Sequence, residues 1–231
     1  MQTTALLYFH QAWEDILFCL PLINYHASRY TFLYVLARQD AWNLLQFYIR
    51  GLKNVSIIYA PLSELNVHGV KLAKLPGATQ LLHGQFDGGR MQQFSADHPK
   101  LRIDQLFYEA YDLPSRQRID SFSFYRDPVT EEVAYIQHVH TSEPYICIHD
   151  EPLDNKFVCE GGESFVDLSS ITSNMFFDAI RILQHAKEIH LVDSIWAIAC
   201  FMMDAKYGLF HQIPIHVYCY NDSELFSSDS R

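Results

Sequence analysis

The chain lacks the phosphate-binding loops and nucleophile motifs that identify many α/β enzymes. Neither a GxGxxG nor a Walker-type loop follows the first apolar run, residues 5–9, and no GxSxG elbow is present. The sequence also contains no Asp-x-Asp pair of the kind that holds a metal–nucleotide complex. A function in this chain must therefore depend on residues outside these motifs.

Paired cysteines, a basic excess and long apolar runs are missing as well. The five cysteines are odd in number and contain no CxxC pair, which is typical of reduced thiols in a cytosolic-type protein. A net charge of −10, from 17 basic and 27 acidic residues, argues against nucleic acid as the main partner. Residues 1–9 lack the basic region of a signal peptide, and no run reaches membrane-spanning length. We therefore expect a cytoplasmic protein with no membrane span.

Large apolar side chains are abundant, and their order predicts an α/β fold. Hydrophobic residues make up 49% of the chain and aromatic residues 14%, enough for a sizeable core. Residues 5–9, 31–38 and 55–61 are expected strands, and helices are expected between them, the first weakened or kinked by Pro21 and the second capped by Asp40. This β-α-β-α-β order favours a parallel sheet covered by helices.

The last third of the chain repeats this alternation. We expect strands at 145–152, 156–161, 188–194 and 213–220, and helices at 173–186 and 195–206. Asp127 and Pro128 open a helix in between, where one lobe gives way to the next. The sequence therefore predicts two small lobes, residues 1–125 and 126–231.

Polar side chains follow three of the expected strands. In parallel sheets, ligands bind beyond the carboxyl ends of strands, near helix N-termini that attract anions. The candidates in these positions are His10, Asp15, His149, Asp150, Asp193 and Ser194. Each has a plainer interpretation, since His10 and Asp15 fit a surface loop, His149 and Asp150 a solvated strand exit, and Asp193 or Ser194 an ordinary N-cap.

A metal centre is not expected from the sequence. His138 and His140 are spaced as two residues on one face of a strand and could be ligands, but no third donor is clustered with them.

The order of motifs along the chain resembles a family of small GT-B-like glycosyltransferases of viral and bacterial type. The segments that carry the resemblance are "YFHQAWEDILFCLPLINYHASRY", "IDQLFYEAYDLPSRQRIDSFSFYRDPVTEEVAY", "YICIHDEP" and "FFDAIRILQHAKEIHLVDSIWA". They are similar, in order, to that family's His-x-Gly-x-Gly-Asp opening, its Phe-x-x-x-Arg-Asp run, its His-Asp-Asp strand end and its Ile-His-x-x-Asp-Ser-Ser segment. Together they span nearly the whole chain.

The resemblance implies two Rossmann-like lobes of GT-B type. The N-terminal lobe would face the acceptor, and the C-terminal lobe would bind a nucleotide-sugar, with no metal and no separate cofactor. The partners would be the nucleotide-sugar and a glycan or small acceptor, in the host cytoplasm if the source is viral, and a second copy of the chain could complete the cleft. Asp15 or His10 would act as the base, and His149, Ser194 and Arg126 would face the donor.

Departures from the family pattern keep a second interpretation open. Ala12 and Glu14 replace the glycines of the first loop, and Ile195 replaces the second serine of the Asp-Ser-Ser segment. After the His149 strand end, where the family often has arginine, only Lys156 supplies positive charge. The alternatives are a catalytically inactive relative that binds or scaffolds, and another nucleotide-dependent transferase.

Overall fold

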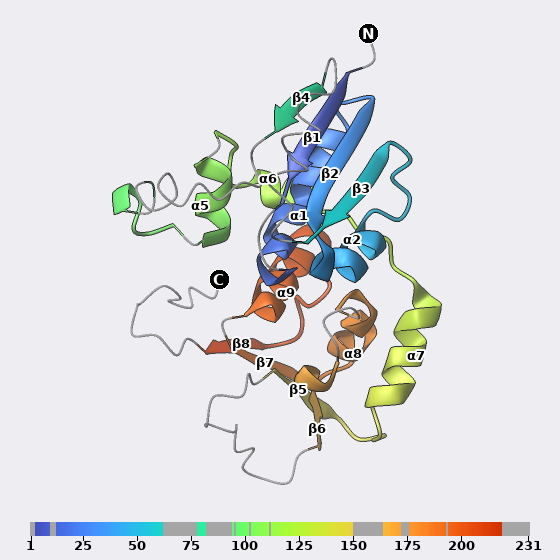
Figure 1. Ribbon diagram of the computed structural model, residues 1–231. Helices are drawn as coiled ribbons and strands as arrows, with labels where there is room; N and C mark the ends of the chain where they lie inside the picture. The colour runs from blue at the N-terminus through green and yellow to red at the C-terminus, as the bar shows by residue number, and fades with distance from the viewer. Residues whose placement is uncertain are drawn as a thin grey trace. The chain divides into compact units, whose positions relative to one another are not determined.

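The chain is an α/β protein whose strands form two parallel sheets (Figure 1). The computed structural model describes residues 3–9, 13–61, 78–81, 94, 96–101, 103–110, 112–149, 164–171, 176–192 and 194–218. Contacts divide the chain into two compact units, Met1–Tyr125 and Arg126–Arg231, the same division that the sequence suggests. The α/β class expected from the sequence is confirmed.

The described residues of unit 1 form a four-stranded parallel sheet in the order β3-β2-β1-β4. Its strands are β1 (Thr4–Tyr8), β2 (Phe32–Arg38), β3 (Val55–Ala60) and β4 (Ala78–Leu81). Its helices are α1 (Trp13–Ala27), the short 3-10 helix η1 (Gln39–Ala41), α2 (Trp42–Tyr48), α5 (Ile103–Glu109) and α6 (Gln117–Asp120). The β-α-β-α-β order predicted for the first 61 residues is therefore confirmed.

Helix α1 is the central element of the core of unit 1. Residues 16–20 are all almost fully buried, and because five consecutive residues cover every side of a helix, α1 is enclosed all round. The helix continues through Pro21. The buried hydroxyl of Tyr108, on α5, donates to the Phe18 carbonyl at 3.0 Å and so ties α5 to α1.

The second helix begins differently from the expectation. Asp40 lies inside η1, and α2 starts at Trp42 without a side-chain cap. The Asp40 carboxylate pairs instead with Arg38 at the end of β2. The prediction that Asp40 is an N-cap was wrong, because a nearby guanidinium competes for the carboxylate.

Unit 2 contains the second four-stranded parallel sheet, in the order β6-β5-β7-β8. Its strands are β5 (Tyr145–His149), β6 (Ser164–Asp167), β7 (Glu188–Val192) and β8 (Ile215–Tyr218). Its helices are α7 (Pro128–His138), η3 (Leu168–Ser170), η5 (Phe177–Ala179), α8 (Ile180–Gln184) and α9 (Ile195–Tyr207). In the part of the chain that the structure describes, no helix has the length and apolarity needed to cross a bilayer.

Local signals explain how two helices of unit 2 begin and end. The Asp127 carboxylate accepts hydrogen bonds from the amides of Val129 and Thr130 at 3.1 and 3.3 Å, with Pro128 at the first helical position, so the predicted start of α7 is confirmed. Helix α9 ends at Gly208, whose φ of 64° is left-handed and favours glycine. Both helix boundaries therefore follow from residues that the local sequence supplies.

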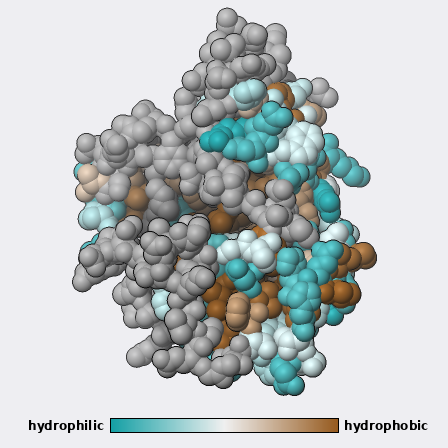
Figure 2. Space-filling view, turned by 60° about the horizontal axis from the view of Figure 1, so that its bottom comes forward, coloured by the Kyte–Doolittle hydropathy of each residue, from teal (hydrophilic) through white to brown (hydrophobic). Residues whose placement is uncertain are grey.

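Helix α7 presents an apolar stripe to solvent. Val129, Val133 and Ile136 are spaced i, i+4 and i+7 and are 72%, 46% and 64% exposed. Figure 2 shows hydrophobic atoms at its right-hand margin, the side on which Figure 1 draws α7. The opposite face of the helix holds the buried residues Glu131 and Ala134. The helix therefore packs through a mixed polar face and leaves much of its apolar surface exposed.

Candidate functional site

The structure brings together two of the residues that the sequence proposes for donor binding. His149 is the last residue of β5, and Ser194 comes just before α9, two residues after the end of β7. Because β5 and β7 are adjacent and parallel, with His149 in register with Leu191, their carboxyl ends meet at one edge of the sheet. The Ser194 Oγ lies 3.2 Å from the His149 Nδ1, which is hydrogen-bond distance.

Ser194 occupies the N-cap position of α9 but does not cap it with its side chain. Its backbone is extended, with φ −150° and ψ 177°, and its carbonyl accepts the first helical hydrogen bond from Ile198. The hydroxyl makes no hydrogen bond to the amides of its own helix and contacts His149 instead. The N-terminus of a 13-residue helix, with its partial positive charge, therefore lies beside a hydroxyl and an imidazole.

Trp196 and Phe176 lie on the same side of the site as His149. His149 is 7% exposed, and its ring lies 5.9 Å from the ring of Trp196, which in turn lies 4.5 Å from Phe176. The hydroxyl of Ser194 can donate to an unprotonated Nδ1 or accept from a protonated one, and in either case it fixes the imidazole orientation. Holding the imidazole in this way reduces the side-chain entropy that His149 loses when it contacts a ligand.

Arg126 has a structural role in unit 2. Its Nε donates to Glu131 Oε1 at 2.8 Å, its Nη2 bonds to Glu131 Oε2, and the same Nη2 donates to Gln184 Oε1 at 3.0 Å. The hydrogen bonds to Glu131, together with the charge of its carboxylate, raise the pKa of the Arg126 guanidinium. Much of its donor capacity is thus used between α7 and α8.

The remaining predicted site residues fall outside the described residues. This applies to His10, Asp150, Lys156 and Asp193, and to the side chain of Asp15, whose backbone lies in the first turn of α1. Their roles stay predictions from the sequence.

An open pocket of about 330 Å³ lies at the opposite end of the unit 2 strands. It is lined by Tyr135, Thr141, Ser142, Glu143, Pro144, Tyr145, His185, Ala186 and Lys187. Most of these residues immediately precede β5 and β7, so the pocket lies at the amino ends of the strands. Ligands of parallel sheets bind at the carboxyl ends, and we therefore favour the His149–Ser194 edge as the functional one.

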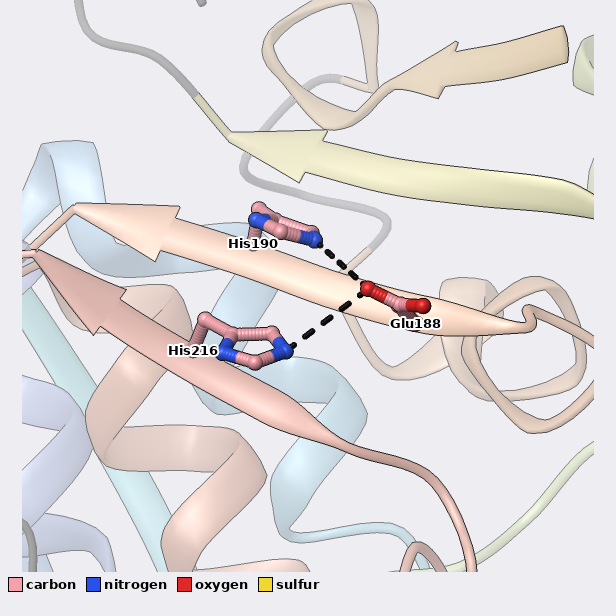
Figure 3. Close-up of side chains that lie close together, drawn as sticks. All are labelled: Glu188, His190 and His216. Atoms are coloured by element: carbon pink, nitrogen blue, oxygen red, sulfur yellow. Dashed lines mark hydrogen bonds and ion pairs between the residues drawn. The ribbon is translucent and has the colours of Figure 1, made fainter. Parts of the chain in front are cut away.

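The structure also shows a cluster that the sequence analysis missed. Glu188 and His190 on β7 and His216 on β8 bring three ligand-type atoms within 4.8 Å of one another (Figure 3). A Glu-x-His pair on an expected strand is a weak signal for such a site. The third member is 26 residues further along the chain and becomes a neighbour only through the pairing of β7 with β8.

The two histidines that the sequence analysis did consider as ligands are placed differently from the expectation. His138 is the last residue of helix α7, so the strand-like spacing assumed for His138 and His140 was wrong. The Nδ1 of His138 lies 3.5 Å from the Ser170 hydroxyl.

Comparison of the chain with protein-family models, with curated proteins and with solved structures gave no match. A function for the chain is therefore inferred from the geometry of the site and from the motifs of the sequence.

Proposed function

We propose that the chain is a glycosyltransferase that moves a sugar from a nucleotide-sugar to an acceptor hydroxyl. Unit 2 binds the donor, with its diphosphate at the start of α9. The observation that carries this proposal is the 3.2 Å contact between Ser194 and His149 at the carboxyl edge of a parallel sheet. The GT-B arrangement of the two units belongs to the same proposal.

The proposed chemistry follows from the groups that lie at the carboxyl ends of β5 and β7. The leaving diphosphate develops negative charge, which the N-terminal amides of α9, the Ser194 hydroxyl and the His149 imidazole stabilise by hydrogen bonds and dipole. Asp15 or His10 takes the proton from the acceptor hydroxyl. No metal takes part in this scheme, so a chelator should leave the transfer rate unchanged.

Composition supports a cytoplasmic setting for this activity. Cys19, Cys147 and Cys200 are buried free thiols, as expected in a reducing compartment. The acceptor in this proposal is a glycan or a small molecule, and a second copy of the chain can complete the acceptor side.

A binding protein without catalysis is the second candidate. Ile195 stands at the first position of α9, where the resembled family has a second serine, so Ser194 is the only hydroxyl at positions 194–196. A site with one hydroxyl can hold a nucleotide without stabilising the leaving group enough for transfer.

Binding of nucleoside diphosphates tests the site directly. Thermal shift and calorimetry with the uridine, guanosine, cytidine and adenosine diphosphates should show at least one that raises the melting temperature. Ser194→Ala removes a hydrogen bond to a charged group, which is about 1.5–3 kcal/mol or roughly 10- to 150-fold in Kd. Ser170→Ala is the matched control, because that hydroxyl bonds to the Asp167 carbonyl in its own turn.

Turnover then separates the two candidates. Hydrolysis of the corresponding nucleotide-sugar, abolished by Asp15→Asn, supports the transferase. Nucleotide binding without any turnover supports the binding protein. If none of the four diphosphates binds, or if Ser194→Ala binds as tightly as the wild type, the proposed site is wrong.

A further inference from the structure

Two histidines and a glutamate converge on one face of the unit 2 sheet (Figure 3). Along β7, the buried residues Ile189 and Leu191 alternate with the more exposed Glu188 and His190, so the latter two share the face opposite the core. His216 is in register with His190 across the β7–β8 pair. The three side chains therefore project from two adjacent strands to the same side.

The histidines approach the same oxygen atom of the carboxylate. Glu188 Oε2 lies 3.2 Å from His190 Nε2 and 3.7 Å from His216 Nε2. The first distance fits a hydrogen bond, but the second exceeds the range of a direct one. Hydrogen bonding alone thus leaves the position of His216 unexplained.

These separations fit the edges of a zinc coordination polyhedron. Zinc binds imidazole nitrogen and carboxylate oxygen at about 2.0–2.1 Å, so ligand atoms at the tetrahedral angle lie about 3.3 Å apart. The separations of 3.2 and 3.7 Å bracket this value, and all three ligand atoms lie within 4.8 Å of one another. An ion between the three side chains would need only small side-chain adjustments.

The surroundings of His190 provide a second, independent sign. Its other ring nitrogen, Nδ1, lies 2.9 Å from the hydroxyl of Tyr218, which also projects from β8. Metal-binding histidines characteristically donate the second N–H to an oxygen, which fixes the tautomer and the ring orientation. The Tyr218 contact directs Nε2 of His190 toward Glu188 and His216.

The ion pair without a metal is the plainer explanation of the cluster. Lys187 approaches the other carboxylate oxygen, Oε1, at 3.9 Å, so Glu188 already has a cation nearby. An ion pair needs one histidine, whereas here two imidazoles stack with their centroids 4.6 Å apart and share one oxygen. The stacking of two imidazoles beside one carboxylate oxygen therefore exceeds what an ion pair requires.

We propose that Glu188, His190 and His216 bind a zinc ion, with water as the fourth ligand. Imidazole donors favour zinc over magnesium or calcium, which prefer oxygen ligands. The side chains are 30%, 19% and 46% exposed, so the ion can reach the site and a water can stay bound. The proposal is independent of the proposed transferase function.

The zinc ion would stabilise the pairing of β8 with β7. β8 pairs only with β7 among the described strands, and its pattern of burial shows that most of its side chains are exposed. A metal that joins His216 on β8 to Glu188 and His190 on β7 therefore adds a cross-strand link at the edge of the sheet. Hydrogen exchange of the β8 amides should slow when zinc is added.

Zinc titration of the full chain, with any affinity tag removed and metal stripped by a chelator, tests the site. We expect one zinc ion per chain at this site, and His216→Gln and Glu188→Gln should each lower the affinity by about tenfold or more. Tyr218→Phe should lower it by about tenfold, because it leaves the ligands in place and removes only the orienting hydroxyl. In cobalt-loaded protein, the visible absorption of a tetrahedral site should disappear in His216→Gln.

His140→Gln is the matched control, an exposed histidine of the same unit outside the cluster. It should bind zinc like the wild type. Glu188→Gln keeps the shape of the side chain, so this variant should fold normally. Circular dichroism can verify that its loss of zinc affinity does not result from unfolding. Zinc binding that persists unchanged in both cluster variants, or a wild-type chain that binds no zinc, overturns the proposal.

Discussion

The pair formed by Arg126 and Glu131 allows a structural role of this arginine to be separated from the predicted role in donor binding. Glu131 lies on the packed face of α7, with its side chain 3% exposed, while the Arg126 side chain is 39% exposed. Arg126→Met removes the charge but keeps most of the aliphatic length. It leaves a buried carboxylate without its bidentate partner.

The expected cost follows from the burial of each partner. Breaking a fully buried ion pair costs about 3–5 kcal/mol, and an exposed pair contributes about 0–1 kcal/mol. Here the group left behind is buried but its partner is partly solvated, so we expect Arg126→Met to cost about 2–3 kcal/mol. Glu131→Gln leaves the half-exposed guanidinium free to reach water and should cost only about 1 kcal/mol.

Urea denaturation of the two single variants and the double variant measures this asymmetry. The double variant Arg126→Met with Glu131→Gln should recover most of the loss, because no uncompensated buried charge remains. If Arg126→Met is no more destabilising than Glu131→Gln, the reasoning is wrong. Nucleotide affinity gives the second readout. If Arg126 binds the donor, the double variant should bind nucleotide weakly even though its stability is recovered.

Three further predictions concern the interior. Asp104→Asn breaks the buried ion pair with Arg118, in which Oδ2 and Nε lie 2.7 Å apart. It should lower the free energy of unfolding, measured by urea denaturation, by about 3–5 kcal/mol. As a control, Asp120→Asn removes an exposed ion pair and should change stability by under about 0.5 kcal/mol. Tyr108→Phe removes the buried hydrogen bond to a carbonyl of α1 and should cost about 1–2 kcal/mol, read by the same method. Burial raises the pKa of the Cys147 thiol to about 12 from an ordinary value of 9.0, so its contribution to stability is complete below pH 9 and falls by about 1.4 kcal/mol per pH unit above it. Thermal melts between pH 8 and 11 should show this fall, reduced in Cys147→Ala; a flat profile would contradict it.

The sequence was most informative where strands are short apolar runs. Residues 5–9, 31–38 and 55–61 are such runs, and the structure places β1, β2 and β3 there, with β1 almost wholly buried and β3 mostly half-buried. Helix α9 was expected over 195–206 and extends over Ile195–Tyr207. Ser194 lies at its N-cap position and Gly208 at its C-cap position, so both ends are marked in the sequence. Strong local signals and burial agree in these elements.

Short elements with little burial were not predicted. α6 has four residues, and β6 has the burial pattern of a partly exposed strand, so neither contains enough apolar periodicity to be recognised. The helix expected over 173–186 is represented by η5 and α8, which together cover residues 177–184. The strand expected at 156–161 lies outside the described residues.

The candidate site shows the same limit at the level of side chains. Sequence order alone proposed His149 and Ser194 for one edge, because the carboxyl ends of parallel strands converge whichever residues separate them. It could not propose Glu188, His190 and His216 as a unit, since that needs the register between β7 and β8, which no local pattern encodes. Tertiary pairing, rather than residue type, is the information that was lacking.

Strand β7 takes part in both proposed sites, yet its pairings keep them separable. The His149–Ser194 contact depends on the β5–β7 ladder and on the short link from β7 to α9, whereas the zinc cluster depends on the β7–β8 ladder at the edge of the sheet. Removing the metal loosens β8 but leaves the β5–β7 ladder paired. Zinc-free protein and His216→Gln should therefore bind nucleoside diphosphate as tightly as zinc-loaded wild type. A change in nucleotide affinity on chelation would instead show that β8 supports the position of α9, and that the two sites are coupled through β7.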